Sequence, residues 1–313
     1  MMSSGRRSDR GRAGAAGDVL ARVSDASGMA SGAPENGEAG PAADDGDAER
    51  VRRDPLSKAL QLITWMVEQE PDNATWGIRE IAGALDLPPS TIYRVLVSLE
   101  RLGLVETDDS SRYRLGMSFF RLAWRATARL PVHRAALAPM RELVAVTNET
   151  ALLGLLDATR LEMMYVAQVE SRQALRYVVD MYEWLPLHAG VGGLGILAFL
   201  DERSWQKVID RGLTAFTDRT ITDPGRLLDQ LRQIRSQGYV IFHGGRISGA
   251  VGVAAPVYGA MGEVIADIVL TVPESRWDGH DEAELSQHLI ACSGRITEQL
   301  GGHPLNRVAG IGP

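Results

Sequence analysis

Hydroxyl, phenol and guanidinium side chains gather directly after the run Leu87-Pro88-Pro89: Ser90 and Thr91 come first, and Tyr93 and Arg94 follow. Hydroxyls and free backbone N–H groups at the start of a helix bind phosphate, and a guanidinium can hold guanine through two hydrogen bonds. This spacing predicts nucleic-acid recognition. Arg94 is the expected base contact, Ser90 and Thr91 are expected on the phosphate backbone, and Tyr93 is expected to face the groove.

Two further cations, Arg112 and Arg114, lie in a short run of alternating apolar and polar residues. Such a run predicts one strand of a hairpin, from which both arginines would reach flanking phosphates or a minor groove. Each position also has a plainer explanation: Ser90 as a helix cap, Tyr93 as a partly buried residue, and the arginines as a solvated strand face. The combination is more specific than any single residue, and it favours DNA binding.

Three predicted helices position these side chains. Apolar residues recur at helical spacing in Leu56–Val67, Ile78–Leu85 and Pro89–Leu102. Pro88 and Pro89 end the second helix and begin the third, which fixes the angle between them. This is the layout of a helix-turn-helix.

A hairpin and a further helix are predicted next. Gly103 fits a helix C-cap, and the runs 104–107 and 112–115 read as two short strands, the wing of a winged helix-turn-helix. Apolar residues recur over 119–130 before Pro131, which predicts a linker helix that could also pair with its copy in a dimer.

Beyond Pro131 the helical and strand patterns alternate, which predicts an α/β domain with a mixed, largely antiparallel sheet. Helices are expected at 134–146, 204–211, 224–237 and 281–300, and another is expected from Gly195 after a glycine-rich turn. Strands are expected at 150–157, 162–170, 175–181, 239–243, 252–257 and 264–272.

Composition limits the possible functions. A chain of 313 residues fits two domains, and a net charge of −7 argues against a protein that coats nucleic acid without sequence preference. Cys292 is the single cysteine, no Cys/His cluster has zinc-site spacing, and no apolar run approaches the roughly 18 residues of a membrane span. The early arginines precede no apolar run, so no secretory signal is expected. A cytoplasmic protein without metal or cofactor is the expectation.

From about Leu56 to Gly301 the chain resembles the IclR family of bacterial transcriptional regulators. The first half of the resemblance is carried by Leu87-Pro-Pro-Ser-Thr-Ile-Tyr-Arg-Val-Leu and Arg112-Tyr-Arg-Leu-Gly. The second half is carried by Leu187-His188, Gly252-Val-Ala-Ala-Pro-Val-Tyr, Gly262-Glu-Val-Ile-Ala and the helix over 285–301.

That resemblance implies an α+β protein with an N-terminal winged helix-turn-helix, a linker helix and a C-terminal GAF-like α/β effector domain. It implies a homodimer or homotetramer that binds an operator and a small-molecule effector. The corresponding division is a disordered tail over 1–51, the winged helix-turn-helix over 52–117, the linker helix over 118–131, the effector domain over 132–303 and a flexible C-terminus over 304–313. Effector-binding residues carried over by position are Val191, Gly192, Phe242, Gly252, Val269 and Thr271.

This chain departs from the family pattern in the implied pocket. Gly193-Leu194 stands where the family commonly has Gly-Lys, and Gly245 and Ile247 stand where acidic residues commonly precede the glycine at 249. The implied lining offers mainly Thr271 among apolar residues. A low-polarity or aromatic effector, or a site that has lost ligand binding, is therefore expected.

Two rival functions remain open. One is an enzyme built on the C-terminal domain, using His188, His243 or Cys292, although no Gly-x-Ser-x-Gly elbow or phosphate-binding loop is present. Cys292 falls on an apolar helical stripe, which favours a core residue, and His188 is expected to hydrogen-bond within a turn. The other rival is a winged-helix regulator without a ligand.

Overall fold

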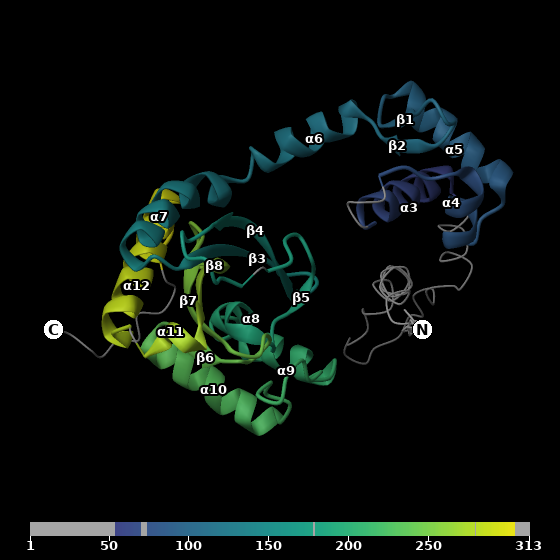
Figure 1. Cartoon of the computed structure of the whole chain (residues 1–313). Helices are drawn as coiled ribbons and strands as arrows, with labels where there is room; N and C mark the ends of the chain where they lie inside the picture. The colour runs from purple at the N-terminus through teal and green to yellow at the C-terminus, as the bar shows by residue number, and fades with distance from the viewer. Residues whose placement is uncertain (1–53, 70–73, 178, 279, 304–313) are drawn as a thin grey trace, which may run out of the picture. The chain divides into compact units, whose positions relative to one another are not determined.

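The computed structural model describes residues 54–69, 74–177, 179–278 and 280–303. The predicted tail over 1–51 and the predicted C-terminal segment over 304–313 lie outside these residues. The chain divides into two compact units after Ala126 (Figure 1). Within the described residues, no helix is both long and apolar enough to cross a membrane.

Unit 1 is a winged helix-turn-helix followed by one further helix. Its elements are α3 (Pro55–Val67), α4 (Ile78–Ala84), α5 (Pro89–Arg101), β1 (Val105–Thr107), β2 (Tyr113–Leu115) and α6 (Met117–Thr127). One core joins the three helices and the hairpin, in which the rings of Trp65 and Trp76 meet edge to face with centroids 5.6 Å apart. Trp76 also pairs with Tyr113 through two backbone hydrogen bonds of 2.8 Å, which attach the wing to the segment before α4.

Unit 2 is built on a six-stranded sheet with the order β5-β4-β3-β8-β7-β6. The strands are β3 (Thr150–Asp157), β4 (Glu162–Val169), β5 (Leu185–Pro186), β6 (Val240–His243), β7 (Ala250–Tyr258) and β8 (Val264–Pro273). Every neighbouring pair is antiparallel. The helices are α7 (Pro131–Thr147), α8 (Gly190–Leu197), α9 (Glu202–Asp210), α10 (Pro224–Gln237), α11 (Glu274–Trp277) and α12 (Glu282–Gln299).

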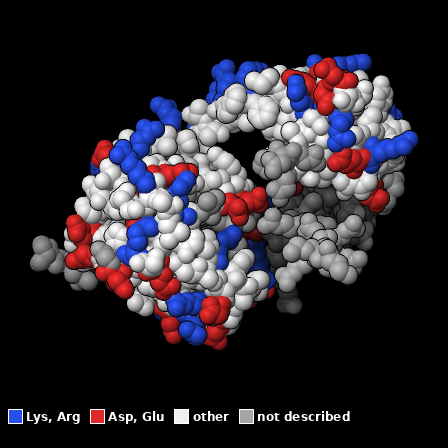
Figure 2. Space-filling view, in the orientation of Figure 1, with Lys and Arg blue, Asp and Glu red and all other residues white. Residues whose placement is uncertain are grey.

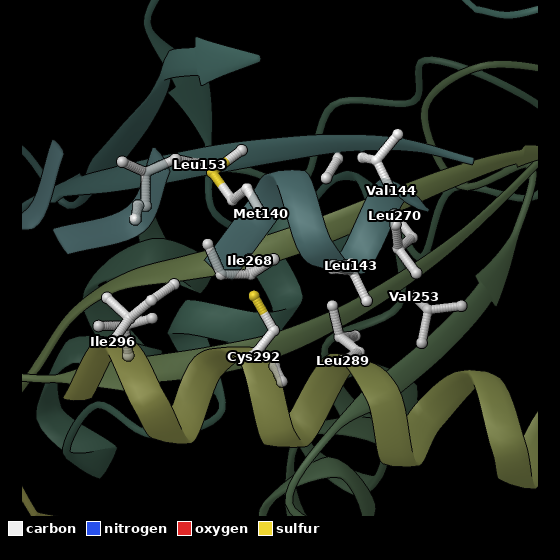
Figure 3. Packing of buried hydrophobic residues seen from close by; sticks show 14 of the residues in the cluster. Met140, Leu143, Val144, Leu153, Val253, Ile268, Leu270, Leu289, Cys292 and Ile296 are labelled. Atoms are coloured by element: carbon white, nitrogen blue, oxygen red, sulfur yellow. The ribbon is translucent and has the colours of Figure 1, made fainter. Parts of the chain in front are cut away.

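Helices α7 and α12 cover one face of this sheet with a purely apolar layer. Figure 3 shows Met140 and Leu143 of α7 and Leu289, Cys292 and Ile296 of α12 against the strand residues. Cys292 is 1% exposed, and burial raises the pKa of its thiol to about 12. It is a core residue, as its place on the apolar stripe predicts.

Helix α8 covers the opposite face, and glycine lets it lie unusually close. A Cβ on Gly193 would lie 2.6 Å from the carbonyl oxygen of Leu187, and one on Gly252 of β7 would lie 2.2 Å from Cγ1 of Val191. Larger side chains at these two positions would push the helix away from its neighbours. The helix therefore starts at Gly190, where the sequence predicts a turn, because this packing outweighs the low helix propensity of glycine.

Two other sequence predictions differ from the structure. The described residues of 175–181 form no strand: Tyr177 donates to the carbonyl of Ser248 over 3.3 Å, and Arg276 binds the carbonyl of Leu175. The sixth strand is instead the short β5. The linker helix ends at Thr127 rather than at 130, because Pro131 disfavours helical backbone at the residue before it.

Asp267 of β8 is fully buried on the face that α8 covers. Its neighbour across the strands is Gly154, and a Cβ there would lie 2.1 Å from Oδ1 of Asp267. Burial raises the pKa of this carboxyl well above its usual value. The folded chain therefore holds a proton that the unfolded chain releases as the pH rises past about 4.

We expect Asp267→Asn to flatten the pH dependence of stability. Because the folded state binds the extra proton, the wild type loses stability as pH rises, by up to about 1.4 kcal/mol per pH unit. The variant should gain on the wild type between about pH 5 and pH 8, measured by urea unfolding at several pH values. Asp218→Asn, at an exposed position, serves as the control. Parallel pH curves for wild type and Asp267→Asn would contradict this assignment.

Candidate functional site

The exposed side of α5 carries the four residues predicted to read nucleic acid. Ile92, Val95, Leu96 and Leu99 form its buried stripe, whereas Ser90 and Arg94 are exposed and the Tyr93 side chain is 53% exposed. Pro88 is the N-cap of α5, and no side chain caps the helix. Ser90 is thus not a helix cap and Tyr93 is not a core residue.

Arg94 is the free cation on this side of α5. Its carbonyl accepts a hydrogen bond of 3.0 Å from Ser98, and its guanidinium forms no hydrogen bond or ion pair with other described residues. An unpaired guanidinium on an exposed helix face can bind a base edge or a phosphate without first breaking an internal contact.

The wing arginines, in contrast, are held within unit 1. Arg112 donates through Nη2 to the carbonyl of Thr75 over 2.7 Å and to Oε2 of Glu80 over 3.0 Å. Glu80 also accepts a hydrogen bond of 3.3 Å from the amide of Gly77 at the start of α4. Arg112 therefore connects the wing to α4, a role that the strand pattern did not predict.

Arg114 pairs with Glu106 on the neighbouring strand over 3.3 Å. A backbone hydrogen bond from Met117 lowers the pKa of the Glu106 carboxyl, and Arg114 lowers it further. Figure 2 shows that Lys and Arg side chains lie beside Asp and Glu side chains over the surface of unit 1. The wing is thus close to electrically balanced, and the unpaired charge is that of Arg94.

In unit 2 the structure brings most of the implied effector residues together. Phe242, Gly252 and Thr271 are direct neighbours across β6, β7 and β8. Val191 of α8 lies on Gly252, and Oγ1 of Thr271 is buried with no hydrogen-bond partner in the described part of the chain. These four residues form one small region between α8 and the sheet.

The two remaining implied residues flank this region. Val269 is fully buried one cross-strand row away, between Ala254 and Leu152. Gly192 lies over β4, where a Cβ would be 2.6 Å from the hydroxyl of Tyr165. Together with the row of Phe242, these residues define the α8 seat: Val191, Gly192, Phe242, Gly252, Val269 and Thr271.

Arg246, which sequence reasoning missed, adds a charge to the α8 seat. It lies in the turn between β6 and β7, and its Cβ would be 3.1 Å from a Cβ on Gly190, the first residue of α8. Thr217 and Thr220 hold this turn by donating to the carbonyls of Gly244 and Gly245 over 2.6 and 2.9 Å. The α8 seat is therefore less uniformly apolar than its implied lining suggested.

The histidines and the cysteine are not arranged for catalysis. Nε2 of His188 lies 3.0 Å from the carbonyl oxygen of Thr214, a contact to a distant loop rather than within its own turn. His243 lies 3.4 Å from Glu274, whose pKa is lowered by a hydrogen bond from Arg219 and then by one from His243. Cys292 is on the opposite face of the sheet. No group of three or more acidic, His or Cys residues in the described ranges could hold a metal ion.

Two family models match the chain: the IclR helix-turn-helix domain over residues 55–109 and the bacterial transcriptional regulator IclR C-terminal domain over residues 124–298. The regulator KdgR of Escherichia coli is 31% identical over 72% of this chain and 86% of its own length. The regulator BhcR of Paracoccus denitrificans is 30% identical over 77% of this chain and 85% of its own length.

A solved structure shares the whole fold. It is an IclR homologue from Microbacterium hydrocarbonoxydans in complex with 4-hydroxybenzoate, with a TM-score of 0.70 and 24% identity, covering 79% of this chain and 99% of that one. The predicted arrangement, a helix-turn-helix domain followed by an α/β domain, is confirmed.

We expect Arg112→Ala to destabilise unit 1, because it removes the hydrogen bonds to Thr75 and Glu80 that fasten the wing. A loss of about 1 kcal/mol is expected, since these contacts are partly solvent exposed. Hydrogen exchange should rise in the segment 74–77. Arg94→Ala is the matched control and should leave both stability and exchange unchanged. Equal behaviour of the two variants would contradict the fastening role of Arg112.

Proposed function

This chain belongs to the IclR family of bacterial transcriptional regulators, and from that premise we propose that it binds an operator through α5 and senses a small, low-polarity or aromatic effector in unit 2. The observation that carries the proposal is the exposed set on α5, with Arg94 unpaired beside Ser90 and Thr91.

On DNA, α5 lies in the major groove. Arg94 donates two hydrogen bonds to a guanine, worth about 1–3 kcal/mol of discrimination, and Ser90 and Thr91 bind flanking phosphates. Tyr93 faces the groove beside Arg94. Arg114 is the wing residue better placed to meet a phosphate, because Arg112 is occupied by Thr75 and Glu80.

The protein acts as a homodimer or homotetramer on a palindromic site. Helix α6 supports this proposal, because it has no buried residue while Leu122 and Trp124 are 52% and 64% exposed. Exposed apolar groups of this size on one short helix favour pairing with a second copy. A dimer would present its two α5 helices to half-sites about 34 Å apart.

The α8 seat binds the effector, and the protein works by binding rather than by catalysis, without a cofactor, in the cytoplasm. Support for the ligand comes from the buried, unpartnered hydroxyl of Thr271 and from Val191, which lies in the space that Gly252 leaves open. A ligand that displaces Val191 would gain contact with the row of Phe242, Gly252 and Thr271. The charged surface of unit 2 and the buried positions of His188 and Cys292 give no support to an enzyme.

We expect selection of genomic DNA fragments by the purified full chain, at physiological salt, to recover a palindromic site. Arg94→Ala should weaken binding to that site by about five- to a hundredfold and relax the preference at one base position, because a bidentate contact is lost. Arg226→Ala, which removes an exposed cation on α10 of unit 2, is the matched control.

The proposal fails if the wild type enriches no sequence over background, or if Arg94→Ala and Arg226→Ala enrich the same sites with equal affinity. Enrichment by the wild type alone would assign sequence reading to α5.

A further inference from the structure

Arg246 places a positive charge inside unit 2 without a partner. Nη1 of its guanidinium is buried and has no hydrogen bond within the described ranges. The group lies over the ring of Phe216, 5.3 Å from its centroid, instead of against a carboxylate. Burial lowers the pKa of Arg246, although a guanidinium remains charged at neutral pH.

A buried N–H group without an acceptor costs free energy, and a charged one costs more. Native proteins keep such groups rarely, so each one requires an explanation. The turn that holds Arg246 is fixed by Thr217 and Thr220, so the side chain is held in place and not merely caught in passing. An acceptor from outside the chain accounts for this arrangement.

Tyr165 supplies a second donor beside Arg246. Its side chain is 7% exposed, and its hydroxyl forms no hydrogen bond with the residues that the structure describes. Burial raises the pKa of this phenol, so it remains protonated and can donate. The hydroxyl lies under Gly192, and the stem of Arg246 lies beside Gly190.

Both donors therefore meet at the first turn of α8. That turn has no side-chain cap, and the N–H groups of its first residues face the end at which Arg246 and Tyr165 lie. A guanidinium, a phenol and a helix start together form a set of donors with an excess of positive charge, which suits an anion.

We propose that Arg246 and Tyr165 select a small monocarboxylic acid with an aromatic or apolar body as the effector of this protein. The inference rests on the proposed function, and it uses two residues outside the set implied by the family resemblance. The carboxylate accepts hydrogen bonds from the guanidinium of Arg246 and the hydroxyl of Tyr165. The apolar body displaces Val191 from Gly252 and contacts Phe242.

The geometry favours one carboxylate over a phosphate or a second acidic group. Arg246 is the single guanidinium at this end of α8, and its planar fork matches the two oxygens of a carboxylate. The remaining lining is apolar apart from Thr271, and Asp267 lies further along the same face. A second negative charge in this lining would have no cation to pair with.

The test compares benzoate and 4-hydroxybenzoate with benzamide, a neutral molecule of nearly the same shape, by calorimetric titration of the full chain. The wild type should bind the two acids at least about tenfold more tightly than the amide, as expected for a charge-assisted pair. Arg246→Met should abolish this preference, Arg246→Lys should retain part of it, and Tyr165→Phe should weaken acid binding with little effect on the amide. Arg226→Met is the matched control for charge and should behave as the wild type.

Thermal unfolding of the unliganded variants separates recognition from structure. Because Arg246 has no internal partner, Arg246→Met should unfold at or above the temperature of the wild type. A clear drop would assign Arg246 a structural role and overturn the proposal. Equal affinity for acid and amide, or no binding of either acid by the wild type, would also overturn it. Operator selection by the same preparation distinguishes these failures from failure of the proposed function, because α5 acts on DNA independently of this site.

Discussion

The close approach of α8 to the sheet is the constraint on which the second unit depends. Gly193 touches the backbone at Leu187, and Gly252 and Gly154 leave room for Val191 and Asp267 between helix and strands. No other residue type allows this spacing without displacing the helix or the sheet. The layer is consequently thin and dry, so each polar group within it must be neutral, paired or available to a ligand. Asp267 meets this condition by keeping its proton, and Arg246 by awaiting an anion.

The two faces of the sheet divide structural and binding roles. On the side of α7 and α12, large aliphatic side chains fill the space, and Cys292 is one small member of that layer (Figure 3). On the side of α8, glycines replace them and polar side chains enter. A core needs dense packing for stability, whereas a binding region needs space that a ligand can take over. The same antiparallel strands serve both, because successive residues point to opposite faces.

Much of this architecture was predictable from local pattern, and the failures have physical causes. The helices of unit 1 follow from apolar spacing and from Pro88 and Pro89, and the strands from alternation. Glycine in α8 predicted a turn because propensity does not anticipate close tertiary packing. Arg112 was assigned to DNA because its partners, Thr75 and Glu80, are distant in sequence. Arg246 was passed over because only the folded turn brings it beside Gly190 and leaves it unpaired.

The claim that the α8 seat controls the α5 face is tested most directly by linkage. A fluorescent operator fragment is titrated with protein in the absence and presence of saturating benzoate, and benzoate is titrated into free and operator-bound protein. The account predicts that both affinities change by the same factor, about five- to a hundredfold, because a coupling free energy is reciprocal. Operator affinity that is unaltered by bound benzoate would contradict it and would leave the ligand site and the DNA-reading helix as independent features.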